Sequence, residues 1–219
     1  MMGEGAVMWP RDIYTEPSKV DVDTLRNLGP LTAMAGIFEG NRSLDIDPKA
    51  AGPERHAFVE HIELQPIDPQ TNGPQLFYGL RYHTHIVKPG EVETFHDQVG
   101  YWLWEPATGT LIQTVAIPRG QVALAFGNAA RDAVSFELAA TRGTDANGIC
   151  SNPFLEYAFK TIEFHIRVTV EAHDRWSYEE DTVLMVHGQS EPFHHRDRSV
   201  LTKIADPTPN PLALAKKHA

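Results

Sequence analysis

The chain has 219 residues, a formal net charge of −10 at pH 7 and a single cysteine, Cys150. The negative charge repels phosphate backbones and disfavours a nucleic-acid partner, while a lone cysteine excludes an internal disulfide. The sequence also contains no apolar run near the roughly 20 residues of a membrane helix and no signal-peptide pattern, so we expect a cytoplasmic protein without a membrane partner.

The first 24 residues have no regular pattern and predict an irregular arm (residues 1–24). A short helix is expected over Leu25–Leu28, because Gly29-Pro30 stops it. The remaining chain divides into one domain, residues 25–205, and a Pro-rich tail, residues 206–219, which we expect to be mobile.

From Gly36 onward, runs rich in β-branched and aromatic residues alternate with turn clusters such as Lys88-Pro89-Gly90. About ten strands joined by short turns favour a closed antiparallel β-barrel, because closure leaves no exposed edge. The fold class is therefore all-β, with short helical segments. The expected strands are Gly36–Leu44, His56–Leu64, Gln75–Val87, Thr94–Glu105, Thr110–Ile117, Gln121–Phe126, Ala133–Thr141, Thr161–Ala172, Trp176–His187 and Phe193–Ile204.

The segment from Gly143 to Phe159 interrupts this rhythm. Asn152-Pro153 is a typical helix start, so a short helix through Phe159 is predicted. The large apolar residues Phe154 and Tyr157 suggest that this helix lies over one end of the barrel.

Histidines are the candidate metal ligands. His83 and His85 lie two residues apart on one strand and share a face, and His96 lies on the next strand. These three could converge on zinc, or they could be solvent-facing strand residues. His194 and His195 are adjacent, so a regular strand points only one of them inward; one neutral imidazole facing an apolar cavity is enough for haem.

Aromatic residues cluster at Tyr101-Trp102-Leu103-Trp104, where the two tryptophans share one face of the strand, and again at Trp176 and Tyr178. They could form either ordinary barrel core or the wall of a ligand pocket.

The order and spacing of several segments resemble the nitrobindin family, whose haem-binding barrels are similar to fatty-acid-binding proteins. These segments include Gly36-Ile37-Phe38-Glu39-Gly40, Phe95-His96-Asp97-Gln98-Val99-Gly100-Tyr101, Trp176-Ser177-Tyr178-Glu179 and His194-His195-Arg196-Asp197.

The resemblance implies a haem b whose iron is held by His195, with His194 as the second candidate. The open side of the iron would bind nitric oxide or isomerise peroxynitrite, which would make the protein an enzyme. Residues expected to line the ligand pocket are His96, Tyr101, Trp102, Tyr178 and Phe38. The alternative is a carrier of fatty acids or other small hydrophobic ligands without haem, and a homodimer is compatible with either.

Overall fold

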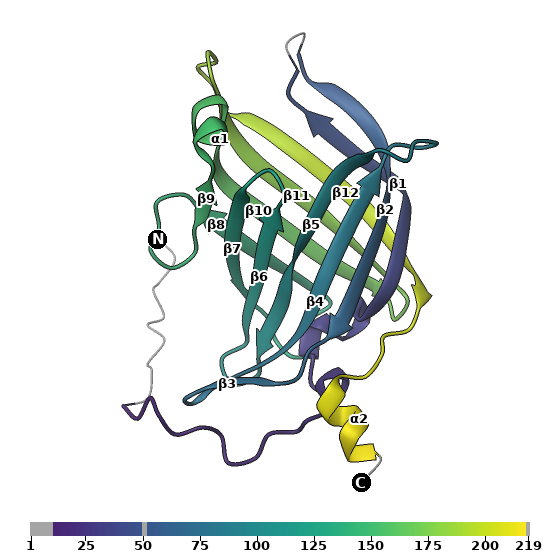
Figure 1. Cartoon of the computed structure of the whole chain (residues 1–219), viewed down its shortest axis with the longest axis vertical. Coiled ribbons are helices and arrows are strands. Elements are labelled where there is room, and N and C mark those ends of the chain that lie inside the picture. Colours follow the sequence, from purple (N-terminus) through teal and green to yellow (C-terminus); the bar gives the residue numbers. More distant parts are fainter. Residues whose placement is uncertain (1–10, 50–51, 218–219) are drawn as a thin grey trace.

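The computed structural model describes residues 11–49 and 52–217, which form a barrel with short helices at both ends (Figure 1). Two 3-10 helices, Thr24–Arg26 and Gly29–Met34, precede the strands. The strands are β1 (Gly36–Asp47), β2 (Glu54–Pro66), β3 (Gln70–Asn72), β4 (Gln75–Val87), β5 (Thr94–Glu105), β6 (Thr110–Ile117), β7 (Gln121–Asn128), β8 (Ser135–Thr141), β9 (Ile149–Ser151), β10 (Phe159–Ala172), β11 (Arg175–Val186) and β12 (Phe193–Ala205). The α-helices are α1 (Pro153–Ala158) and α2 (Pro211–Lys217).

Ten strands close the barrel, as the sequence predicted. They pair antiparallel in the order β2-β1-β12-β11-β10-β8-β7-β6-β5-β4, and pairing of β2 with β4 joins the two ends. The short strands β3 and β9, which were not predicted, lie beside β4 and β7. Alternation along β10 gives the strand an inner and an outer face: Ile166 and Val168 are buried inside the barrel, whereas His165 and Arg167 are exposed outside.

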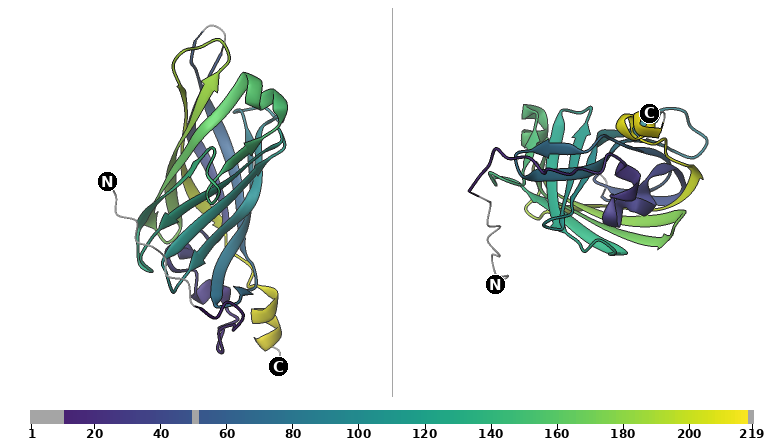
Figure 2. Two further views of the ribbon diagram at one scale, coloured as in Figure 1. Left: turned by 90° about the vertical axis from the view of Figure 1, so that its left-hand side faces the viewer. Right: turned by 90° about the horizontal axis from the view of Figure 1, so that it is seen from below.

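The 3-10 helices lie across one end of the barrel, as the view from below shows (Figure 2). The side chains of Leu31 and Met34, and of Leu28 just before the second helix, are fully buried in the main core. Gly29 has a φ of 56°, and a Cβ there would lie 2.6 Å from the ring of Trp104. This glycine therefore allows both the turn and the close approach of backbone to indole that seals the end.

The C-terminal segment after Asp206 is docked, where the sequence predicted a mobile tail. Asn210 is buried, and its side-chain amide donates to the carbonyl of Val22 at 2.9 Å and to Asp68 at 2.7 Å. Composition alone predicted mobility because it shows no partner for this asparagine. Of the predicted N-terminal arm, residues 1–10 lie outside the described residues, and 11–23 contain no helix or strand.

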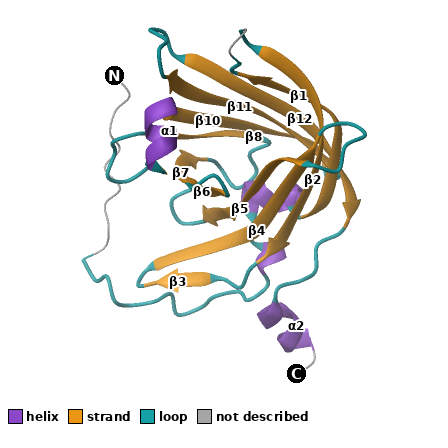
Figure 3. Cartoon of the chain, turned by 45° about the horizontal axis from the view of Figure 1, so that its top comes forward, coloured by secondary structure: helices purple, strands orange, loops and turns teal. Residues whose placement is uncertain are grey.

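Helix α1 forms where the sequence placed it, and the Asn152 side chain caps it by accepting from the backbone N–H of Phe154 at 2.8 Å. It packs at the rim of the barrel against β10 (Figure 3). Its aromatic side chains do not bury themselves, because Phe154 and Tyr157 are each 65% exposed. No helix among the described residues is long and apolar enough to cross a membrane.

Candidate ligand site at the open end of the barrel

Carboxyl groups line one wall of the upper barrel. Cross-strand register places Asp45 of β1 opposite Asp197 of β12, and Asp197 opposite Glu180 of β11. Glu60 of β2 faces inward beside them and is almost completely buried. This wall ends at the opening opposite the 3-10 helices, so the interior has an apolar closed end and an acidic open end.

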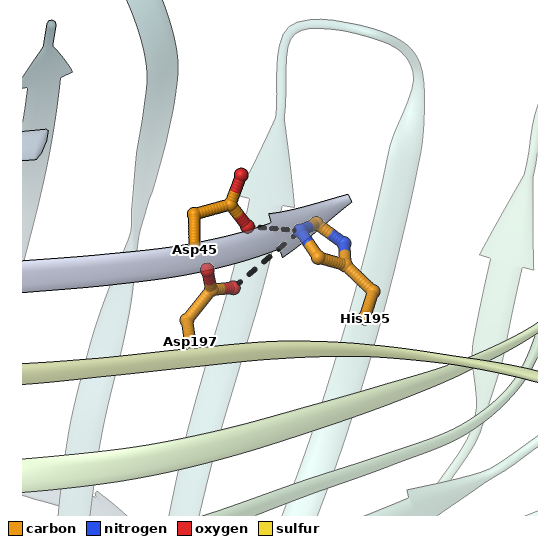
Figure 4. Close-up of side chains that lie close together, drawn as sticks. All are labelled: Asp45, His195 and Asp197. Carbon is orange, nitrogen blue, oxygen red and sulfur yellow. Dashed lines mark hydrogen bonds and ion pairs between the residues drawn. The ribbon is translucent and has the colours of Figure 1, made fainter. Parts of the chain in front are cut away.

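His195 lies on this wall beside Asp45 and Asp197 (Figure 4). Its Nε2 lies 2.7 Å from Oδ1 of Asp45 and 3.7 Å from Oδ2 of Asp197. The histidine side chain is 31% exposed, whereas that of Asp45 is only 3% exposed. The other oxygen of Asp45, Oδ2, is buried without a hydrogen-bond partner among the described residues.

The three groups differ in how readily they hold a proton. Burial disfavours charge on all of them, but the hydrogen bond between His195 and Asp45 outweighs it, raising the pKa of His195 and lowering the pKa of Asp45. Burial, together with the hydrogen bond and negative charge of Asp45, raises the pKa of Asp197 well above its usual range. These directions favour an imidazolium–carboxylate pair between His195 and Asp45, beside an Asp197 carboxyl group that gives up its proton less readily than usual.

A hydrogen-bonded network lies deeper along the same wall. The hydroxyl of Tyr178 donates to Oε2 of Glu60 at 3.1 Å, and the hydroxyls of Ser43 and Ser199 lie 2.6 Å apart. Burial raises the pKa of Glu60 to about 7. Loss of hydration likewise raises the pKa of Glu180 to about 7. Neutral or proton-sharing carboxyl groups therefore face the interior near neutral pH.

The opposite wall carries a second, neutral polar chain. Nε2 of His96 lies 3.2 Å from Oε1 of Gln98, whose amide donates to the hydroxyl of Tyr82 at 2.7 Å. That hydroxyl donates in turn to the carbonyl of Thr114 at 3.0 Å. Burial lowers the pKa of His96 and keeps its imidazole neutral.

The predicted site residues separate into distinct environments. His195 faces inward, whereas His194 is exposed and its Nδ1 lies 2.8 Å from Asp181 outside the barrel. His96 and Tyr178 lie in the polar interior, while Trp102 and Phe38 are buried in the main apolar core.

One sequence-based expectation is wrong, and one of two open alternatives is not supported. Tyr101 does not line the pocket: it is 46% exposed, because strand alternation turns its neighbour Trp102 inward and Tyr101 outward. The zinc set of His83, His85 and His96, which the sequence left as an alternative to solvent-facing strand residues, does not converge. The exposed His83 bonds to Asp97 on the outside at 3.0 Å, whereas His96 points into the barrel.

Sequence reasoning also missed the carboxyl groups that surround His195. Alternation along β12 already places Asp197 and Ser199 on the same face as His195. That signal was present in the sequence. Asp45 and Glu60 could not be found in this way, since their proximity depends on the pairing of β1 with β12 and with β2.

An open groove of about 690 Å³ follows the same strands, and its lining includes Asp197 and Glu180 of the acidic wall as well as exposed charged residues such as Arg167. Some of its outward-facing charges are paired: Arg167 donates to Glu137 at 2.6 Å and Arg196 donates to Asp181 at 3.1 Å across neighbouring strands. Because exposed, mutually paired charges leave little for a ligand to satisfy, we place the candidate site inside the barrel.

A barrel closed by apolar residues at one end and lined by polar groups at the other defines a small-ligand-binding class of fold. Residues 27–203 match the family described as "THAP4-like, heme-binding beta-barrel domain". The chain therefore belongs to this haem-binding family, the nitrobindin family.

A solved structure shows the same fold. It is the crystal structure of Rv2717c from M. tuberculosis, which has 19% sequence identity and a TM-score of 0.57 and covers 84% of this chain and 99% of its own. No curated protein matches the chain.

The family's cofactor can be tested against the donor atoms. Haem iron requires a neutral imidazole nitrogen with a free lone pair. The His195 side chain points into the barrel, as an iron ligand must. Its Nε2, however, is hydrogen-bonded to Asp45, and this pair favours the protonated imidazolium form. As they lie in this structure, the residues around Nε2 do not fit haem iron; a fit requires Asp45 to release the histidine.

Proposed function

We propose that the interior of the barrel binds haem b at its open end, with His195 as the iron ligand after release from Asp45. The observation that carries the proposal is the orientation of the histidine pair within a haem-binding family: His195 alone of the two enters the barrel. The apolar core beneath the polar wall supplies a surface on which a porphyrin face can rest.

The charge of the wall argues against the carrier alternative. A fatty acid would place its carboxylate in the interior, where arginine or another cation would be needed to hold it. Here the inward groups near the mouth are themselves acidic, namely Asp45, Asp197, Glu180 and Glu60. A neutral or metal-centred ligand suits this interior better than an anionic lipid.

Haemin titration followed by the Soret band tests the proposal. We expect a saturable shift in the wild type that is retained in His194→Ala and lost in His195→Ala. The matched control is informative because His194 has a similar carboxylate partner but lies outside the barrel.

Two further variants sharpen the result. Asp45→Asn removes the charge that holds Nε2, so haem binding should become tighter than in the wild type. A shift that survives His195→Ala but disappears in His96→Ala would transfer the ligand role to the neutral interior histidine. No saturable shift in the wild type would reject haem binding.

Haem held by His195 would supply an iron centre for reaction with nitric oxide or peroxynitrite, the chemistry that the family resemblance implies. We therefore propose peroxynitrite isomerisation as an activity of the haem-loaded protein. Nitrate yield and peroxynitrite decay, measured with and without haem, test this step separately from binding; equal decay rates in the two samples would exclude it.

A further inference from the structure

Because Nε2 of His195 is held by Asp45 and does not fit haem iron as it lies, the surroundings of this nitrogen suit a different ligand. A buried carboxylate normally has a hydrogen-bond partner on both oxygens, or a cation beside it. Asp45 is 2% exposed, yet its Oδ2 has no partner among the described residues. Asp197 brings a second carboxyl group to the same nitrogen of His195, at 3.7 Å.

We propose that Asp45, His195 and Asp197 form a binding site for a divalent first-row transition cation such as Zn²⁺. One nitrogen and two carboxylate oxygens, one atom from each residue, lie within 4.8 Å of one another. This goes beyond haem binding, because the cation would be held by three side chains of the chain itself.

The spacing of the donors supports the assignment. Zinc bound at about 2.0–2.2 Å to nitrogen and oxygen separates neighbouring tetrahedral donors by roughly 3.4 Å. The observed separations from Nε2 are 2.7 Å to Asp45 and 3.7 Å to Asp197, which lie on either side of that value. Shifts of about 0.7 Å and about 0.3 Å would bring the two distances to that value, and a fourth position would stay open.

The donor types also select among cations. Mg²⁺ and Ca²⁺ favour shells made only of oxygen, whereas an imidazole together with carboxylates suits zinc and similar transition ions. Two of the three donors lie on one strand: His195 and Asp197 are two residues apart on β12 and share its inward face. β1 brings Asp45 opposite them, so rigid sheet pairing holds all three in place.

The two occupants compete for a single nitrogen. A cation uses Asp45 as a ligand, whereas haem requires Asp45 to withdraw. Asp45→Asn therefore distinguishes the two proposals, because it should lower the affinity for the cation and raise the affinity for haem.

Calorimetric titration of the metal-free, haem-free protein with ZnCl2 provides the test. We expect one site in the wild type. Asp45→Asn and Asp197→Asn should each weaken it by more than the roughly 10- to 100-fold that loss of an outer-shell partner costs. Asp181→Asn removes the comparable carboxylate beside His194 on the outside of the barrel and should leave the zinc affinity unchanged. Titration with MgCl2 should give no binding.

Several outcomes would overturn the site. Zinc affinity that is retained in Asp45→Asn but lost in His56→Ala would place the ion at the neighbouring Asp47, Glu54 and His56 cluster. Absence of zinc binding by the wild type would also reject it. Retained haemin binding by Asp45→Asn shows that the variant is folded. A protein that binds haem but not zinc refutes this inference alone, and one that binds zinc but not haem refutes only the proposed function.

Discussion

The closed and open ends of this barrel are built from the same strands but differ in the side chains that face inward, which are apolar at the closed end and ionisable at the open end. At the closed end, Trp104, Leu31 and Met34 are fully buried against one another, and the strands there need only apolar side chains that fill space. At the open end, the inward positions of β1 and β12 carry Asp45, His195 and Asp197. Since buried charge is costly, these groups either pair, as His195 does with Asp45, or hold their protons more tightly than usual, as Asp197 does.

The comparison predicts that truncation at the closed end has the largest effect on stability. Trp104→Ala removes the indole under the 3-10 helices and should lower the free energy of unfolding by about 3–5 kcal/mol. Val99→Ala on the outer face of the same strand, where the side chain is 46% exposed, should cost only about 0.5 kcal/mol. Denaturant unfolding measures both, and similar losses would mean that the closed end is not the stabilising core.

The open end should instead respond to pH through Glu60. Its folded pKa of about 7 lies above the ordinary value of 4.5, so the folded protein holds this proton more tightly. The resulting stabilisation is fully present below pH 4.5 and is lost as the pH rises through 7. The glutamine of Glu60→Gln cannot ionise. Above pH 7, the free energy of unfolding of this variant should therefore exceed that of the wild type by on the order of 3 kcal/mol.

Unfolding at pH 5 and pH 8 tests this prediction, with the exposed Glu91→Gln as the control. If Glu60→Gln shows the same pH dependence as the wild type, Glu60 does not carry a raised pKa.

A smaller effect should follow from loosening the C-terminal segment at the closed end. Asn210→Ala removes the side-chain donor to the carbonyl of Val22 and one of the donors to Asp68, which keeps the backbone N–H of Leu212 at 3.0 Å, at a cost of about 1–3 kcal/mol. Leu212→Ala, at a position 48% exposed, should change little. Faster amide exchange in residues 211–217 of the Asn210 variant would locate the effect, while unchanged exchange would show that α2 is held by other contacts.

The most local effect concerns the titration of His195. Asp45→Asn removes the partner whose hydrogen bond and charge raise the pKa of this imidazole, so burial should then dominate and the pKa should fall. Imidazole resonances followed by NMR against pH measure the change. Asp181→Asn on the outer face should leave the His195 titration unchanged; an equal shift in both variants would contradict a specific Asp45–His195 pair.

The sequence by itself determined most of the barrel. Alternation and turn residues placed Gln75–Val87, Thr94–Glu105 and Thr110–Ile117 with the bounds that the structure shows. These signals are local, because a strand with one buried face must repeat every two residues. The short strands β3 and β9 were not predicted, because three residues are too few to show an alternating pattern. They are strands because they pair with β4 and β7.

The interior of the site was decided by tertiary structure. Adjacency in the sequence showed that only one of His194 and His195 could enter the barrel, but not which one. Pairing of β1 with β12 decided that Asp45 meets His195, although 150 residues separate them in the chain. The proton affinities of Asp197, Glu60 and His195 follow from burial and from neighbours on other strands. Such values depend on distance and dielectric environment, which strand closure creates and no local pattern encodes.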